Sequence, residues 1–151
     1  MMIRALPAVL LCFAVAGCAA SAATGQSRSY VAPRTPADTD QPPFSGGVRV
    51  GDTLYLPGVL GLDPGQKVPE TVEAEARNVL NAIKASLAGA GMTMDDLVYV
   101  QIFCPDVSHY ATFNAVYRTY FTREYPARAF IGSGPLLYGA RFEVQGIAVK
   151  R

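Results

Sequence analysis

Apolar residues recur at helical spacing between residues 72 and 87. They fall three or four positions apart and would line one face of a helix: Val72, Ala76, Val79, Leu80, Ile83 and Leu87. Charged residues between them, such as Glu73, Glu75 and Arg77, fall mostly away from that stripe. The pattern predicts an amphipathic helix, which Gly89 or Gly91 would end.

A second helical pattern runs from Tyr110 to Phe121, where aromatic residues recur at three- and four-residue steps. Ser108 stands where a helix cap is expected. His109 is the only histidine, and we interpret it as a solvated helix-end residue, with a general base as the alternative.

Short runs rich in β-branched and aromatic residues predict the strands. Val48–Val50 and Thr53–Leu56 are expected to be two strands joined by a tight turn at Gly51-Asp52. The run 97–103 (LVYVQIF) is typical of a strand buried on both faces. Residues 127–131 and 141–149 are predicted as the last two strands.

The predicted order is β-β-α-β-α-β-β, which indicates an α+β fold with a single sheet and two helices on one face. In the last strand Phe142, Val144 and Ala148 share one face. The opposite face is a mixture of polar and apolar residues: Arg141, Glu143, Gln145, Ile147 and Val149. Two helices cannot cover both faces of the sheet, and a mixed second face is typical of a subunit interface. We therefore expect a homo-oligomer.

Composition narrows the class of protein. The chain has 151 residues, a length typical of a single domain. It has 13 Lys and Arg residues against 12 Asp and Glu residues. Only 17% of residues are charged, which argues against disorder, and the even balance argues against a nucleic-acid partner. The mean hydropathy of +0.20 requires either a membrane-directed segment or extra buried surface.

The first residues have the order of an export signal. Arg4 precedes an apolar run of residues 5–16 that is too short to span a bilayer, and small residues follow. Val15-Ala16-Gly17-Cys18 resembles a bacterial lipobox, which predicts a signal peptide over 1–17 and lipidation of Cys18. The alternative is an ordinary signal cut after Ala22. Either route exports the domain, as a membrane-anchored lipoprotein or as a soluble periplasmic or secreted protein.

Residues 18–43 are rich in Ser, Thr, Pro and small residues without apolar periodicity, which predicts a flexible tether, and the folded domain is expected over 44–151. Cys12 would leave with the signal and Cys18 would carry lipid. Cys104 would then have no partner for a disulfide, and we interpret it as a buried apolar residue rather than a nucleophile.

Five segments resemble the RidA/YjgF family of reactive-intermediate deaminases in order and spacing: GDTLYLPGVLGLDP, EAEARNVLNAIKASLAGAGMTMDDLVYVQIF, FNAVYRTYF, YPARAFI and RFEVQGIAVKR. The resemblance covers 44–151. It implies a chorismate-mutase-like fold and a homotrimer whose sheets face a central barrel. It also implies clefts between subunits that hydrolyse enamine or imine intermediates, such as 2-aminoacrylate, to 2-keto acids and ammonia without a metal or cofactor.

Two residues match the family's catalytic positions. Arg128 corresponds to the arginine that binds the substrate carboxylate, a task for which its planar fork is suited. Glu143 corresponds to the glutamate that positions water. The alternatives are a surface or salt-bridged Arg128, and an ion pair of Glu143 with Arg141 or Arg128.

Other positions match or depart from the family's pocket. Gly58 is retained, and Asn114 matches an asparagine that has either a substrate-binding or a structural role. Phe44 stands where the family has a tyrosine, and Phe130 where many members have cysteine. Further replacements are the apolar residues Pro57 and Val59 and the uncharged Gln145. These departures predict a more apolar pocket that is suited to a bulkier substrate.

Three functions are compatible with these residues. The first is an exported imine deaminase that acts on a small carboxylate substrate. The second is a trimeric binding protein that uses the same cleft without turnover. The third is another hydrolase, including the ribonuclease activity attributed to some relatives, against which the neutral charge balance counts.

Overall fold

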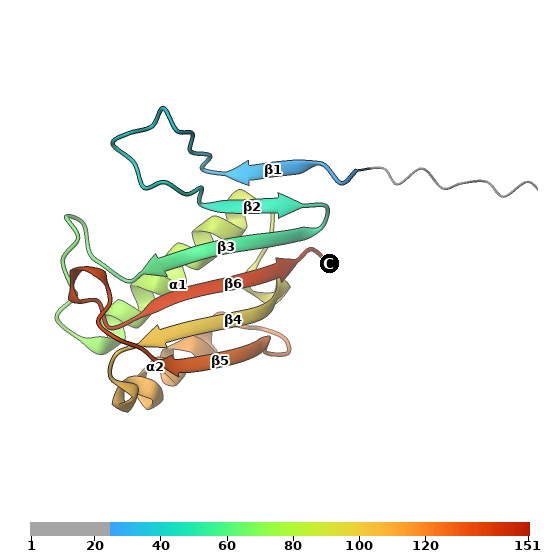
Figure 1. Cartoon of the computed structure of the whole chain (residues 1–151). Helices are drawn as coiled ribbons and strands as arrows, with labels where there is room; N and C mark the ends of the chain where they lie inside the picture. The colour runs from blue at the N-terminus through green and yellow to red at the C-terminus, as the bar shows by residue number, and fades with distance from the viewer. Residues whose placement is uncertain (1–24) are drawn as a thin grey trace, which may run out of the picture.

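The computed structural model describes residues 25–151, which form one six-stranded sheet and two α-helices. The strands are β1 (Arg28–Val31), β2 (Gly47–Val50), β3 (Thr53–Leu60), β4 (Leu97–Cys104), β5 (Ala127–Gly132) and β6 (Glu143–Val149). Their order is β1-β2-β3-β6-β4-β5, so β1 and β5 are the edges (Figure 1). Only β4 and β5 pair in parallel.

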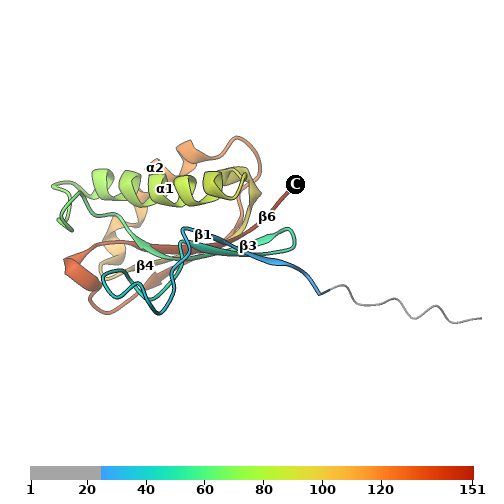
Figure 2. The ribbon, with the colours of Figure 1, turned by 90° about the horizontal axis from the view of Figure 1, so that it is seen from above.

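Both helices, α1 (Val72–Gly89) and α2 (Tyr110–Tyr117), lie on one face of the sheet (Figure 2). The opposite face carries no helix of the described chain. The predicted α+β class, with one sheet and two helices on one face, is therefore confirmed. The alternation predicted for the last strand is also confirmed, because Val144 and Ala148 are buried beneath the helices while Val149 is exposed.

Local chemistry sets both ends of α1. The Thr71 hydroxyl accepts a hydrogen bond from the Ala74 amide and caps the helix. At the other end, the amides of Gly91 and Met92 donate to the carbonyls of Ala88 and Leu87. Gly91 has a φ of 68°, in the left-handed region that glycine adopts without strain. Of the two glycines predicted to end α1, Gly91 is the one that turns the chain.

The second helix is shorter than its aromatic pattern predicts and begins differently. The Asp106 carboxylate caps the 3-10 turn of residues 107–109, where it accepts a hydrogen bond from the Ser108 amide at 2.9 Å, and no side chain caps α2 itself. The predicted Ser108 cap is wrong because Asp106 begins a short 3-10 turn that leads into α2. After Tyr117 the chain continues as another 3-10 turn to Tyr120. The aromatic pattern that runs to Phe121 therefore extends beyond the α-helix.

Strand β4 is buried on one face only, which corrects the prediction for 97–103. Val100, Ile102 and Cys104 are buried against the helices, whereas Val98 is 46% exposed. The apolar run lacks alternation because its other face belongs to the uncovered side of the sheet, which the single chain leaves in water.

The segment expected to be a flexible tether contains strand β1. Arg28 pairs with Val50, and Val31 pairs with Gly47, so β1 extends the sheet antiparallel to β2. The described part of residues 18–43 is therefore not wholly unstructured, and the sheet begins before Phe44. The predicted signal peptide and the lipidation site at Cys18 lie outside the described residues. Within 25–151 no helix combines the length and apolarity needed to cross a bilayer.

Candidate functional site

Arg128 lies on edge strand β5 and faces the helices. Its register partner on β4 is the buried Val100, so the two side chains share the helix-covered face. The guanidinium lies 4.7 Å from the centre of the Tyr117 ring and 5.8 Å from that of Tyr110. Such stacking holds a cation in place while leaving its N–H groups available.

No described carboxylate pairs with Arg128 within 4 Å. A salt bridge of Arg128 is therefore not seen within the described part of the single chain. Arg128 instead lines a cavity of about 250 Å³. Most of the lining residues are tyrosines and arginines: Tyr110, Asn114, Tyr117, Arg118, Tyr125, Pro126 and Arg128. A half-buried guanidinium beside open volume is suited to binding an anion.

Two residues that line this cavity carry a buried polar atom without a hydrogen-bond partner within the described structure: Asn114, at its Oδ1, and Tyr117, at its hydroxyl. Burial raises the pKa of Tyr117, so its phenol keeps its proton. A hydrogen bond from Asn114 and the positive charge of Arg128 lower the pKa of the exposed Tyr110. A buried unpaired donor and acceptor are costly unless a ligand or water satisfies them.

The tyrosines of this cavity were not among the predicted site residues. The spacing of Tyr110 and Tyr117 predicts a helix and nothing more, and Tyr117 also packs in the core, where it stacks with Phe113 at 5.9 Å. The signal that distinguishes them from core residues is the phenol itself, which places a polar group at the end of an apolar stripe.

Phe130 packs inside the fold. Its ring meets Tyr110 edge-on at 5.1 Å and Phe113 at 5.7 Å. It does not line the Arg128 cavity. The predicted substrate contact of Phe130 is therefore not seen in the single chain, where the Phe130 ring packs against Tyr110 instead.

Glu143 begins β6 on the opposite, uncovered face of the sheet. Its register partners are Leu60 on β3 and Phe103 on β4, and the next residue, Val144, is buried beneath the helices. Among the described residues Glu143 has no ion pair, neither with Arg141 nor with Arg128. The ion-pair alternative for Glu143 is therefore not seen within the described part of the single chain.

A groove of about 910 Å³ contains Glu143 together with Phe44 and Gly58. Its lining is otherwise largely apolar, and includes Pro57 and Val59 from β3 and Tyr138 from the turn before β6. The structure thus brings together the predicted residues of β3, β6 and the segment before β2.

The observed position of the Glu143 carboxylate requires that residue 58 has no side chain. A Cβ atom built on Gly58 would overlap Glu143 Oε1. The pairing of β3 with β6 shifts register between Leu56 and Val59, and Pro57, which has no N–H to donate, lies within this irregularity. The local bulge and the missing side chain together let the carboxylate lie against the β3 backbone.

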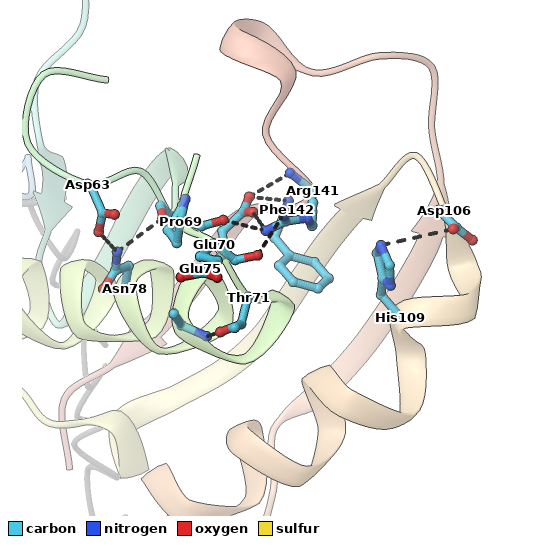
Figure 3. Close-up of polar contacts among 12 residues, drawn as sticks. Asp63, Pro69, Glu70, Thr71, Glu75, Asn78, Asp106, His109, Arg141 and Phe142 are labelled. Carbon is cyan, nitrogen blue, oxygen red and sulfur yellow. Dashed lines mark hydrogen bonds and ion pairs between the residues drawn. The ribbon is translucent and has the colours of Figure 1, made fainter. Parts of the chain in front are cut away.

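Glu75 on α1 is fully buried, which corrects its predicted place on the solvent side of the helix. Figure 3 shows its carboxylate at the segment that enters β6. It accepts hydrogen bonds from the amide of Arg141 at 2.5 Å, the amide of Phe142 at 3.1 Å and Arg141 Nη1 at 2.9 Å. Arg141 therefore turns to the helix side, and these bonds anchor the chain immediately before Glu143.

His109 is half-buried, and not the solvated helix-end residue that the sequence predicts. Its ring meets Phe142 edge-on at 6.2 Å, and its Nε2 lies 3.9 Å from Asp106 Oδ2 (Figure 3). It lines neither the Arg128 cavity nor the Glu143 groove. The alternative role as a general base therefore has no support from its position.

Cys104 is fully buried at the end of β4, as predicted. Its thiol donates a hydrogen bond to the Asp106 carbonyl at 3.0 Å, and burial raises the pKa of the thiol. A buried thiol that keeps its proton is a poor nucleophile.

The Gln145 side chain, on the same face as Glu143, donates a hydrogen bond to Gln101 Oε1 at 2.8 Å. This neutral pair bridges β6 and β4, where a second acid beside Glu143 would add negative charge. No cluster of three or more His, Cys, Asp or Glu side chains able to hold a metal occurs within residues 25–151.

One chain does not unite the two candidate catalytic residues. Arg128 faces the helices from edge strand β5, whereas Glu143 faces away from them on β6, and β4 lies between these strands. The fold and the two half-sites therefore define a class of small α+β protein in which an arginine-lined cavity and a carboxylate-bearing groove lie on opposite faces of one sheet.

Comparison with known proteins identifies the family. Residues 37–150 match the sequence model of the family described as endoribonuclease L-PSP. The 2-iminobutanoate/2-iminopropanoate deaminase of Mus musculus is 37% identical over 110 residues, which cover 72% of this chain and 82% of that protein. The chain belongs to this family, which is the RidA/YjgF family.

Solved structures agree with that assignment. RidA from the Antarctic bacterium Psychrobacter sp. superposes with a TM-score of 0.68 and 33% identity, over 72% of this chain and 89% of that one. TdcF from E. coli, solved with bound serine, has a TM-score of 0.70 and 28% identity, over 74% and 91%.

Proposed function

We propose that this protein is an imine deaminase, which hydrolyses the imine or enamine form of a 2-amino acid to a 2-keto acid and ammonia. The proposal rests on Arg128 and Glu143, two charged residues that form no ion pair among the described residues. Each lies beside open volume, and each is at a position that matches the family's catalytic pattern. The similarity to the mouse deaminase supports the same reaction.

The proposed site is completed by two copies of the chain in a homotrimer. Arg128 and Asn114 of one copy would face Glu143 of the next, because a single chain holds them on opposite faces. The uncovered face of the sheet supports such assembly: Tyr55, Ile147 and Tyr99 lie side by side across β3, β6 and β4. Tyr55 is 50% exposed and Tyr99 36%, an apolar surface that a partner subunit would cover.

In this mechanism Arg128 binds the substrate carboxylate with its planar fork, and Asn114 and the Tyr117 phenol complete the polar cradle. Glu143 accepts a proton from a water molecule as the water oxygen bonds to the imine carbon. That proton is then delivered to the nitrogen, which gives a carbinolamine. The proton of its new hydroxyl group follows to the nitrogen as the C–N bond breaks, the C=O bond forms and ammonia leaves. Water and imine account for all atoms of the products, and no electron transfer is needed.

The test measures loss of imines generated in situ from L-amino acids by an amino-acid oxidase. Arg128→Ala is expected to lower kcat/KM roughly 100-fold, because a charge-assisted bidentate contact is lost. Glu143→Gln is expected to lower kcat while the affinity for 2-keto acids remains. Arg77→Ala is the matched control, since Arg77 forms an exposed pair with Glu73. Imine loss equal to that of Arg128→Ala for every amino acid would refute the deaminase.

A binding protein without turnover is the second candidate. The replacement of the family's polar groups by Phe44, Pro57 and Val59 favours it, and the relative with bound serine shows that a family member holds an amino acid. Thermal stabilisation of the wild type by 2-keto acids, absent in Arg128→Ala and accompanied by no imine loss, would support this function in place of the first.

We also propose that the domain acts outside the cytoplasm, anchored through lipid on Cys18. The proposal rests on the apolar run of residues 5–16 and the sequence Val15-Ala16-Gly17-Cys18. Labelled palmitate should be incorporated into the full chain in a bacterial host and not into Cys18→Ser. Failure of the wild type to take up label would refute the anchor.

A further inference from the structure

The groove that contains Glu143 is apolar along most of its wall. The side chains of Phe44, Pro57, Val59, Leu62, Leu137 and Tyr138 line it. Asp40, Gln66 and Ser86 are the other polar side chains of the groove besides Glu143. A water-binding carboxylate thus lies in surroundings that favour an apolar ligand group.

Several of these apolar side chains have no cover within the described chain. Leu137 is 71% exposed, Tyr138 57% and Phe44 53%. All three border one groove and come from two separate segments, one before β2 and one before β6. Figure 2 shows both segments, coloured teal and red-orange, on the side of the sheet away from the helices. Large apolar side chains gathered around one hollow indicate a ligand with an apolar group.

The turn that carries Leu137 and Tyr138 holds an unusual conformation. Tyr138 has a φ of 59°, in the left-handed region that side-chain-bearing residues rarely adopt. Such strained positions gather at ligand sites, where the surrounding structure holds a side chain in a required direction. Here the conformation places the Tyr138 side chain at the groove, together with Leu137.

The groove is also large for a small substrate. Its volume is about 910 Å³, against about 250 Å³ for the cavity beside Arg128. The partner subunit of the proposed trimer would occupy part of this volume, and a two- or three-carbon imino acid would make few contacts with the apolar wall near Glu143. A branched or aromatic side chain would contact that wall, because buried apolar area is the main source of affinity in such pockets.

We infer that the substrate is a 2-imino acid with a branched or aromatic apolar side chain, which lies in the groove of Phe44, Val59 and Leu137. The inference rests on the proposed deaminase function and specifies its substrate class. The reaction is R–C(=NH)–COO⁻ + H₂O → R–C(=O)–COO⁻ + NH₃, where R is the apolar side chain. Arg128 binds the carboxylate and Glu143 the water, so the groove is left for R.

The experiment compares kcat/KM of the full chain for imines made from leucine, phenylalanine and alanine. The values for leucine and phenylalanine should exceed that for alanine at least 10-fold, because one methylene in an apolar pocket contributes roughly 10–200-fold to discrimination. Leu137→Ser and Val59→Gln should each reduce that ratio severalfold, because each removes an apolar contact to the substrate side chain. Tyr30→Ser, on β1 and outside the groove, is the control and should leave the ratio unchanged.

Binding of the product acids provides a readout that does not need turnover. Calorimetric titration should give tighter binding of 4-methyl-2-oxopentanoate and phenylpyruvate than of pyruvate, and Leu137→Ser should remove the difference. Turnover with equal or greater efficiency on the alanine imine would overturn the substrate class and leave the deaminase standing. Selective binding of the bulky acids without turnover of any imine would refute the deaminase and keep the apolar specificity.

Discussion

The cavity at Arg128 and the groove at Glu143 differ in the chemistry of their walls. Tyrosines, an asparagine and a second arginine surround Arg128, whereas apolar side chains surround Glu143. The first wall presents groups suited to a carboxylate, which every 2-amino acid derivative carries. The second presents a surface suited to an apolar side chain. In the proposed deaminase, binding of the common group and selection of the variable group are therefore separated on two faces of one sheet.

The two regions are also held differently. The position of Glu143 depends on hydrogen bonds to the buried Glu75 and on the absence of a side chain at Gly58. Arg128 is held by stacking on Tyr117 and Tyr110. Glu143 should therefore be sensitive to changes in the backbone, and Arg128 to changes in neighbouring side chains.

The largest effect is expected where the two regions must meet. Ile147→Asp places a charge in the row of Tyr55, Ile147 and Tyr99 on the uncovered face. Burial of an unpaired carboxylate at a subunit contact is strongly unfavourable, so we expect a monomer by light scattering. Turnover should fall more than 100-fold, because Arg128 and Glu143 would no longer share a site.

Ala85→Asp is the matched control, since Ala85 is an exposed residue of α1 on the helix side. It should leave both the oligomeric state and the activity unchanged. Full activity in monomeric Ile147→Asp would refute the composite site and require each half-site to act alone.

Gly58→Ala tests the groove alone. The new methyl group would overlap the Glu143 carboxylate and displace it, while the fold has no other reason to change. Because a displacement of about 1 Å at a catalytic group costs up to roughly 100-fold in rate, kcat should fall about 10- to 100-fold. Affinity for a 2-keto acid, measured by calorimetry, should change much less.

Gly134→Ala provides the control, since a Cβ atom at Gly134 meets nothing within 4 Å. Its kinetics should match those of the wild type. A wild-type kcat in Gly58→Ala would show that Glu143 does not act from the observed position.

Glu75→Gln tests the anchor of the groove. The buried carboxylate accepts two backbone hydrogen bonds and one from the Arg141 guanidinium, which is itself partly exposed. Loss of the charge should lower the free energy of unfolding by about 2–3 kcal/mol, measured in urea. Glu73→Gln, in the exposed pair with Arg77, should cost less than about 0.5 kcal/mol. Equal effects of the two substitutions would remove Glu75 as an anchor.

Sequence alone predicts the features that neighbouring residues determine. The span of α1 follows from its apolar spacing, and the faces of β6 follow from alternation at Val144 and Ala148. Family resemblance adds Arg128 and Glu143, whose chemistry belongs to single side chains. These features need no knowledge of which distant segments meet.

The features that sequence analysis misses depend on distant contacts. Glu75 resembles a solvent-facing helix residue until Arg141, 66 positions later, brings its amide to the carboxylate. Strand β1 is polar and short, and it is recognisable only from its pairing with β2. The sequence of β4 predicts a strand buried on both faces, because apolar residues on an uncovered sheet face cannot be distinguished in sequence from residues of a core.

The smallest predicted effect concerns the pH dependence of the Arg128 cavity. A hydrogen bond from Asn114 and the charge of Arg128 lower the pKa of Tyr110 from its ordinary value of 10.0. As the pH rises through that lowered pKa, Tyr110 becomes a phenolate beside Arg128 and competes with the ligand carboxylate for the guanidinium. Affinity for a 2-keto acid should therefore decline from below pH 10, by about fivefold, the order expected for one nearby charge in a solvent-exposed site.

Tyr110→Phe should abolish this decline, because the ring remains beside Arg128 while the titrating hydroxyl is gone. Tyr30→Phe, on β1 and away from the cavity, should retain it. Calorimetric titration of each variant between pH 8 and pH 10.5 separates the two, and the groove should contribute little to the difference, since apolar contacts do not titrate. An unchanged decline in Tyr110→Phe would assign the titration to another group and leave Tyr110 as a packing residue for Arg128 and Phe130.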